Sequence, residues 1–179
     1  VRKELGIRNE YLVGTVGRFS YQKNPFFELE IIKCIFQEYE DAKFLWIGSG
    51  DLQKEIEEKA RAYGIYNRII FLGNTEHVNE YYQAMDAFLF PSLFEGLCFV
   101  GIEAQAAGLP VIFSDQITSE AKMTNNVSFL PIDETSLSAW QSQVIKDLEL
   151  GHRDNYDLLS RQKLDITDTV AAFMKLYNS

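Results

Sequence analysis

Short runs of β-branched and aromatic residues recur along the chain, each bounded by Gly, Asp or Pro. The runs are apolar on both faces instead of alternating with polar residues, which is typical of strands buried between two layers of helices. We expect six such strands, at residues 11–17, 43–50, 68–73, 86–91, 110–115 and 127–132.

Apolar residues at helical spacing separate the expected strands. Asn24-Pro25 predicts a helix start, with Asn as the cap and proline at the first helical position, and the apolar stripe continues to Tyr39. A second stripe fills residues 51–64, with Asp51 as the expected cap and Gly64 as the stop. Two further helices are expected on Leu137, Trp140, Val144 and Leu148, and on Val170, Phe173, Met174 and Tyr177.

Strands and helices that alternate in this way predict an α/β fold with a doubly wound, mostly parallel six-stranded sheet, which is a Rossmann-like arrangement. Six strands are too few for an eight-stranded barrel. We expect one domain over residues 1–179, with a core from 11 to 148 and a helical tail from 149 to 179. Within the tail, residues 149–166 are the most polar stretch and are expected to form a surface connection.

The composition, with 46% hydrophobic and 24% charged residues, is that of an ordinary globular protein. The expected location is cytoplasmic, because no apolar run approaches the roughly 20 residues that span a bilayer and the first residues do not resemble a signal peptide. Cys34 and Cys98 lack the spacing of a disulfide framework or a metal site, which favours a reducing compartment.

The net charge of −9 is unevenly distributed along the chain. Residues 1–24 hold five basic residues and two acidic ones, so the remaining chain has a net charge of −12. That bulk charge repels nucleic acid and anionic membranes, and neither is expected as a partner. An anionic ligand would need a few specifically placed cations, and the N-terminal segment is where they are found.

In open α/β sheets, ligands bind beyond the carboxyl ends of the strands, so the loops after each strand carry the candidate chemistry. The loop after the first strand contains Gly17, Arg18 and Lys23. A planar guanidinium and a lysine ammonium can grip a diphosphate from two sides, although the same residues also fit a solvated basic loop. The loop is not a phosphate-binding Walker loop, because the Gly-Lys-Ser/Thr ending is missing.

The loops after the second and third strands carry weaker signals. Gly48, Ser49 and Gly50 resemble a fragment of a dinucleotide fingerprint, but a tight strand-to-helix turn explains them equally well. In the next loop Asn74 or Thr75 can cap the following helix. His77, near the start of that helix, is expected to have no special role. No Asp-x-Asp pair is present to carry a divalent ion, so no metal site or cofactor is expected.

The stretch FEGLCFVGIEAQAAGLPVI, residues 94–112, is the most specific. Glu95 lies in a loop before a helix expected to begin near Leu97 or Cys98. The unsatisfied backbone amides at the start of that helix form an anion site. Glu103 follows after seven residues, among apolar neighbours on an expected buried face. The two carboxylates could accept hydrogen bonds from the two ends of a nucleotide sugar. In the alternative, Glu95 caps the helix and Glu103 pairs with a core arginine.

Taken together, these segments resemble the C-terminal half of the retaining glycosyltransferases with two facing Rossmann-like domains, known as family 4 or group 1 of the GT-B fold. The similarity runs in order and spacing through VGRFSYQKN, FLWIGSGDL and residues 69–115, and covers about residues 1–132 closely. The Glu, seven residues, Glu pattern is the hallmark of that family.

The resemblance implies a nucleotide-sugar donor site. It implies Arg18 and Lys23 on the diphosphate, Glu95 at the sugar hydroxyls and Glu103 on the ribose, with Glu95, Arg18 and Lys23 as the catalytic set. It also implies a donor-binding set that comprises Gly17, Arg18, Lys23, Asn74, Glu95, Gly96, Leu97, Cys98, Phe99 and Glu103, in which the backbone near Gly73 and Asn74 neighbours the base.

Two departures from the family pattern stand out: Cys98, where a proline or small residue is common, and Gln105, where an apolar residue is common. The family's N-terminal acceptor domain is also absent from this chain. We therefore expect a fragment that is inactive alone, whose partners are a UDP- or GDP-sugar and the missing domain. Membrane contact would come only through that domain, at the cytoplasmic face.

The implied function is transfer of a hexose, with retention, from a UDP- or GDP-sugar to a saccharide or lipid-linked acceptor in cell-surface polysaccharide or glycoconjugate synthesis. Fixed positive charge would stabilise the leaving nucleoside diphosphate without a metal. The alternative is a nucleotide-binding regulatory module with no transfer activity of its own. A dinucleotide-dependent oxidoreductase is disfavoured, because the loop after the first strand lacks the Gly-x-Gly-x-x-Gly sequence.

Overall fold

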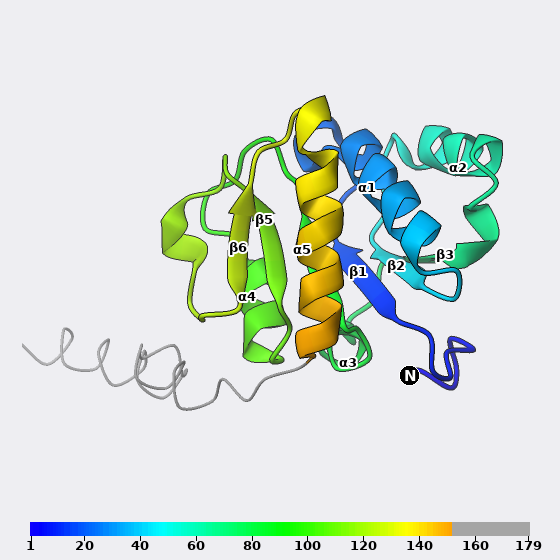
Figure 1. Ribbon diagram of the computed structural model, residues 1–179, viewed down its shortest axis with the longest axis horizontal. Coiled ribbons are helices and arrows are strands. Elements are labelled where there is room, and N and C mark those ends of the chain that lie inside the picture. The colour runs from blue at the N-terminus through cyan, green and yellow to red at the C-terminus, as the bar shows by residue number, and fades with distance from the viewer. Residues whose placement is uncertain (152–179) are drawn as a thin grey trace, which may run out of the picture.

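A single six-stranded parallel sheet forms the centre of the computed structural model, which describes residues 1–151 (Figure 1). The strand order is β3-β2-β1-β4-β5-β6, so the order reverses between β1 and β4. The strands are β1 (Leu12–Val16), β2 (Lys43–Ile47), β3 (Ile69–Gly73), β4 (Ala87–Phe90), β5 (Val111–Ser114) and β6 (Val127–Leu130).

Helices cover both faces of the sheet. One face, towards the viewer in Figure 1, packs against α1 (Pro25–Glu38), α2 (Gln53–Ala62) and α5 (Leu137–Leu150). The other packs against the much shorter α3 (Val78–Tyr82) and α4 (Phe99–Ala106). The expected doubly wound, Rossmann-like fold is therefore confirmed.

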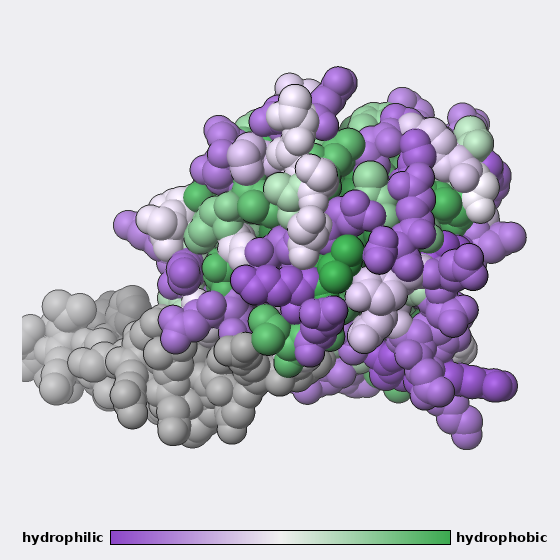
Figure 2. Space-filling model, viewed as in Figure 1, coloured by the Kyte–Doolittle hydropathy of each residue, from purple (hydrophilic) through white to green (hydrophobic). Residues whose placement is uncertain are grey.

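Each face of the sheet has its own hydrophobic cluster, because alternate residues of every strand point to opposite sides. On the α1 and α5 side the cluster contains Phe19, Trp46 and Trp140, all essentially inaccessible to water. On the α4 side it contains Tyr82, Phe88, Phe113 and Cys98. The outer surface over α1 and α5 is mainly hydrophilic, with hydrophobic residues in small separate groups (Figure 2).

The carboxyl ends of β1, β2 and β3 meet at closely packed glycines. The amide of Gly17 donates to the carbonyl of Ile47 at 2.9 Å, and the amide of Gly48 donates to the carbonyl of Gly73 at 2.9 Å. Gly48 has a φ of 138°, and a Cβ there would lie 2.1 Å from the carbonyl oxygen of Gly17. Glycine is therefore required at 48 by both conformation and space.

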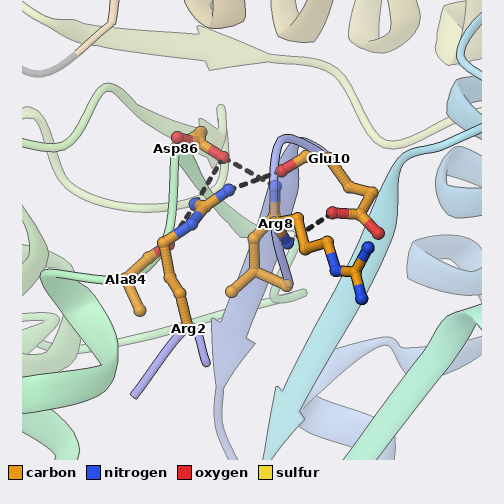
Figure 3. Close-up of polar contacts among 6 residues, drawn as sticks. Arg2, Arg8, Glu10, Ala84 and Asp86 are labelled. Carbon is orange, nitrogen blue, oxygen red and sulfur yellow. Dashed lines mark hydrogen bonds and ion pairs between the residues drawn. The ribbon is translucent and has the colours of Figure 1, made fainter. Parts of the chain in front are cut away.

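The N-terminal segment is fastened to the amino ends of the strands by Arg2 (Figure 3). Its guanidinium donates to the carbonyl of Ala84 at 2.7 Å and the carbonyl of Glu10 at 2.5 Å, and pairs with Asp86 at 3.1 Å. The same carboxylate oxygen of Asp86 accepts from the amide of Leu12 at 2.7 Å. This part of the basic N-terminal segment is thus committed to structure and not to a ligand.

All six expected strands are confirmed within a few residues. Asn24 holds the expected cap position of α1 and Gly64 follows the end of α2, but the expected capping by side chains is not found. Asn24 precedes α1 in the left-handed conformation, with φ of 55° and no capping bond from its side chain. Asp51 is not a cap either, because α2 begins at Gln53 and Leu52 holds the cap position. Proline at the first position of α1 is confirmed.

The helix expected from Leu137 to Leu148 is confirmed as α5, whereas the helix expected over 170–177 lies outside the described residues. So does nearly all of the expected surface connection over 149–166. Within residues 1–151, no helix has the length and apolar character needed to cross a membrane.

Candidate functional site

A pocket of about 320 Å³ opens where β1, β2 and β3 end. It is lined by Gly17, Arg18, Gly48 and Asn74, together with Val16, Ile47, Thr75 and Val78. We call it the strand-end pocket. Arg18 is exposed, and no ion pair joins it to another described residue. Three of the predicted site residues, Gly17, Arg18 and Asn74, therefore share one cavity at the edge where α/β sheets bind ligands.

Lys23 and Glu95 form a close ion pair beside this edge. The ammonium of Lys23 lies 2.5 Å from Oε1 of Glu95, and the two side chains retain only 18% and 13% of their exposure. Lys23 belongs to a 3₁₀ turn, Tyr21–Lys23, that leads into α1, and its ammonium also lies 4.4 Å from the centre of the Phe90 ring. The fold thus brings together two predicted site residues that lie 72 positions apart in the sequence.

Gln22 ties the two loops that carry this pair. Its side-chain amide donates to the carbonyl of Phe94 at 3.0 Å and to Oε1 of Glu95 at 3.2 Å. Its own carbonyl accepts from the amide of Leu93 at 2.8 Å. Glu95 is therefore held by a cation and a neutral donor at once, and both come from the β1–α1 connection.

The start of α4 lies directly after Glu95. The helix begins at Phe99 with Cys98 at the cap position, so the alternative in which Glu95 caps it is wrong. None of the hydrogen bonds found among residues 1–151 uses the backbone amides of Gly96, Leu97 or Cys98. Amides at a helix start favour anions. The Cys98 side chain is buried, and burial raises the pKa of its thiol to about 12, so it remains protonated.

Glu103 contradicts one expectation: its side chain is exposed, not buried. Its partner is not a core arginine but Tyr82, whose hydroxyl donates to Oε2 of Glu103 at 3.1 Å and lies 3.1 Å from the carbonyl of Val100. Burial, followed by the charge of Glu103, raises the pKa of Tyr82. The tyrosine is therefore a neutral donor to the carboxylate.

A second pocket, of about 540 Å³, lies between α3 and α4. Glu103 and Tyr82 line it with Glu76, Asn79, Gln83, Val78, Ala106 and Ala107. We call it the helix pocket. Val78 lines both pockets, so the helix pocket and the strand-end pocket adjoin one another at the start of α3.

A third carboxylate, not predicted from the sequence, lies beneath the Lys23 turn. Glu28, in the first turn of α1, is 2% exposed, and its Oε1 has no hydrogen-bond partner among the described residues. Burial raises the pKa of this carboxyl well above its usual range, while the Thr15 hydroxyl and the Lys23 ammonium act in the opposite direction. The burial favours the neutral form.

The predicted residues thus fall into three groups. Gly17, Arg18 and Asn74 line the strand-end pocket, Lys23 and Glu95 pair beside the start of α4, and Glu103 lines the helix pocket. Gln22, Tyr82 and Glu28 were missed. Gln22 and Tyr82 each carry a neutral donor that no periodicity or charge pattern singles out.

The described geometry can be set beside known proteins. The family described as glycosyl transferases group 1 matches residues 10–147. The chain belongs to this family. EpsF of Bacillus subtilis (strain 168), named as a putative glycosyltransferase, is 32% identical over 171 residues, which cover 93% of this chain and 44% of that protein. This group 1 chain therefore spans less than half the length of that relative.

Two solved structures share the fold of this group 1 domain. The C-terminal domain of a glycosyl transferase group 1 family protein (LpcC) from Francisella tularensis has a TM-score of 0.76 at 22% identity, with 90% of each chain covered. Anabaena Alr3699/HepE in complex with UDP has a TM-score of 0.80 at 20% identity, and 99% of this chain and 51% of that one are covered. The described domain thus has the Rossmann-like fold of a C-terminal group 1 domain.

Proposed function

We propose that this domain binds the nucleotide-sugar donor of a glycosyltransferase that moves a hexose from a UDP- or GDP-sugar to a saccharide or lipid-linked acceptor with retention. The observation that carries the proposal is the Lys23–Glu95 pair beside the unengaged amides of residues 96–98, which lead into α4. A cation, a helix N-terminus and a carboxylate are the three groups that a diphosphate joined to a sugar requires.

Each part of the donor has a place in this proposal. Arg18 and Lys23 hold the diphosphate, and the backbone amides of residues 96–99 donate hydrogen bonds to the phosphate and the sugar. Glu95 accepts from sugar hydroxyls and Glu103 from ribose hydroxyls, and the strand-end pocket beside Asn74 takes the base. Alr3699/HepE, which shares the fold, was solved in complex with UDP, and this supports a nucleotide as a ligand.

The chemical contribution of this half is electrostatic. As the bond between sugar and diphosphate breaks, negative charge grows on the departing phosphate, and fixed donors stabilise it without reorganisation. Arg18, Lys23 and the α4 amides can supply that stabilisation, and we propose that no divalent ion is needed. Donor binding should then be equal in magnesium and in excess EDTA, whereas a tenfold loss on chelation would contradict metal independence.

The acceptor would be held by the half of the protein that this chain does not contain. Large apolar side chains stand exposed around the site, with Tyr21 at 76% and Phe99 at 69%, and Phe94 and Leu97 also exposed. Such residues suit an acceptor or a facing domain. The proposed setting is polysaccharide or glycoconjugate synthesis at the cytoplasmic face of a membrane, and the domain alone should transfer no sugar.

The deciding test is ligand stabilisation followed by a ribose comparison. UDP- and GDP-sugars should raise the melting temperature of the 179-residue chain, whereas NAD should not, since a ligand stabilises only the state that binds it. Glu103→Gln should weaken nucleotide and nucleotide sugar alike, by about 1.5–3 kcal/mol for a lost charged hydrogen bond. An unchanged melting temperature with every nucleotide sugar would overturn the proposed function.

A further inference from the structure

Lys23, one of the two cations assigned to the diphosphate, already has a close anionic partner. Its ammonium lies 2.5 Å from Glu95, and Gln22 holds the same carboxylate oxygen. We infer that Glu95 competes with the nucleoside diphosphate for Lys23, and that this competition makes the site favour the sugar-bearing donor over the free nucleoside diphosphate. The inference rests on the proposed donor site and concerns its selectivity.

A phosphate bound to Lys23 would lie close to the Glu95 carboxylate. A phosphate oxygen bound to the ammonium lies about 2.8 Å from Nζ. Because Nζ is 2.5 Å from Oε1 of Glu95, that phosphate oxygen lies at most about 5.3 Å from the carboxylate oxygen. Both groups are negative and the site is largely shielded from water, so their repulsion is weakly screened.

The carboxylate cannot easily withdraw from the ammonium. Gln22 donates to Oε1 of Glu95 and to the neighbouring carbonyl of Phe94, which fixes the loop on one side. The Phe90 ring lies against Lys23 on another, at 4.4 Å. A diphosphate must therefore take Lys23 from a partner that remains nearby.

The sugar changes this balance. When a hexose is attached, its hydroxyls can donate to Glu95 and replace the hydrogen bonds that the ammonium provided. A free nucleoside diphosphate brings no sugar hydroxyl to Glu95, so Glu95 remains paired with Lys23. Once the sugar has been transferred, Glu95 recaptures the ammonium and thereby promotes release of the product.

The second glutamate provides a control within the same domain. Glu103 is held by the neutral Tyr82 hydroxyl and not by a cation. A substitution at Glu103 therefore releases no positive charge for a phosphate. It should weaken nucleotide and nucleotide sugar alike, in contrast to the behaviour inferred for Glu95.

The experiment is calorimetric titration of the 179-residue chain with UDP, GDP, UDP-glucose, UDP-galactose, UDP-N-acetylglucosamine and GDP-mannose. Glu95→Gln keeps the shape of the side chain and removes its charge. We expect it to bind the nucleoside diphosphate roughly fivefold to tenfold more tightly, as for release of a partly shielded ion pair. The nucleotide sugar should bind no more tightly than to the parent, so the preference for the donor falls.

A double substitution isolates the role of Lys23. In the Lys23→Ala background, adding Glu95→Gln should change nucleoside diphosphate affinity by less than about twofold, because the contested cation is gone. Glu95→Ala carries the same expectations as Glu95→Gln if the glutamine variant melts early, and melting curves check every variant.

The outcomes separate the two proposals. A parent chain that binds no nucleotide or nucleotide sugar contradicts the proposed function itself. A parent chain that binds nucleotides, with Glu95→Gln no tighter for the diphosphate, overturns the competition alone. A gain of equal size in the Lys23→Ala background also overturns it, because the effect would then be general charge repulsion.

Discussion

The Glu95 loop and the Glu103 turn of α4 carry the same functional group in opposite settings. Glu95 is largely shielded and held by a lysine and a glutamine from the β1–α1 connection. Glu103 is exposed and held by a single tyrosine hydroxyl from α3. One carboxylate therefore has a cationic partner before any ligand arrives, whereas the other has none among residues 1–151.

Because the two carboxylates have different partners, a ligand must displace different groups at the two positions. A hydroxyl that approaches Glu103 replaces water, whereas a ligand that approaches Glu95 must rearrange an ion pair. The first arrangement suits a group that is always present on a nucleotide, and the second suits a group that distinguishes one ligand from another. In the proposed donor site, the pairing of each carboxylate would therefore distinguish its role from that of the other.

The largest expected effect comes from displacing α4, which carries Glu103 and follows the Glu95 loop. In Gly101→Ala, the new Cβ would lie 2.3 Å from the Phe113 ring and 3.2 Å from the sulfur of Cys98. We expect a loss of about 3 kcal/mol in the free energy of unfolding from overpacking, measured by urea denaturation. Gly96→Ala is the matched control, since nothing lies within 4 Å of a Cβ there. Equal stability of the two variants would contradict the close packing of α4 on β5.

Next in size is removal of the cation on the Glu95 side. Lys23→Ala should weaken nucleoside diphosphate binding by about 2 kcal/mol, through loss of a charge-assisted contact. Lys54→Ala on α2, where the lysine is 88% exposed, is the control and should leave affinity unchanged. Calorimetry on both variants checks this, and affinity of Lys23→Ala within twofold of the parent would remove Lys23 from the diphosphate site.

The buried Glu28 offers a third setting, neither exposed nor closely paired. Its folded-state pKa is raised by burial, so its stabilising contribution is complete below the unfolded pKa of about 4.3 and is lost as pH rises towards the folded value. Glu28→Gln removes this loss. As pH rises through that window, the free energy of unfolding of Glu28→Gln should increase relative to that of the parent, by up to about 1.4 kcal/mol for each pH unit.

Urea denaturation between pH 4 and 8 measures the gain. The exposed Glu38→Gln on the same helix serves as the control and should show no such slope. A constant difference between Glu28→Gln and the parent across this range would mean that the pKa of Glu28 is the same in the folded and unfolded protein.

The smallest expected effect concerns the hydrogen bond between Tyr82 and Glu103. Tyr82→Phe removes only the hydroxyl that donates to Glu103, and should weaken UDP binding by about 1 kcal/mol through loss of a positioning contact. The penalty should be much smaller for 2′-deoxy-UDP and in the Glu103→Gln background, where the positioned interaction is already lost. Tyr81→Phe is the control. Equal losses for both nucleotides would mean that Tyr82 acts only on stability.

The fold was predictable because its signals are local and repeated. Strands apolar on both faces determined the six-stranded sheet, and Gly48 marked a place where only glycine fits. Asn24 holds the predicted cap position of α1, but it adopts a left-handed conformation that its sequence neighbours do not reveal, and its side chain makes no capping bond. Cap geometry depends on where the chain arrives from, and that is a tertiary property.

Gly17, Arg18 and Asn74 were predictable as neighbours at one edge of the sheet, and so were Lys23 and Glu95, whereas Gln22, Tyr82 and Glu28 were missed. Glu103 was expected to be buried from its apolar neighbours, yet α4 turns it outwards to the helix pocket. Glu28 could have been noticed, since it shares helical spacing with the buried Ile31, Ile32 and Ile35. Gln22 and Tyr82 gain their importance only from partners that the fold brings near.

The Arg2 clamp has a mechanical consequence. Because three contacts fix Arg2 at the amino ends of the strands, a segment joined ahead of Val1 would be attached at the edge opposite Glu95. β1 alone separates the two edges by about 16 Å. A rotation of the domain about a point before Arg2 would therefore displace the Glu95 edge by an amount proportional to this separation.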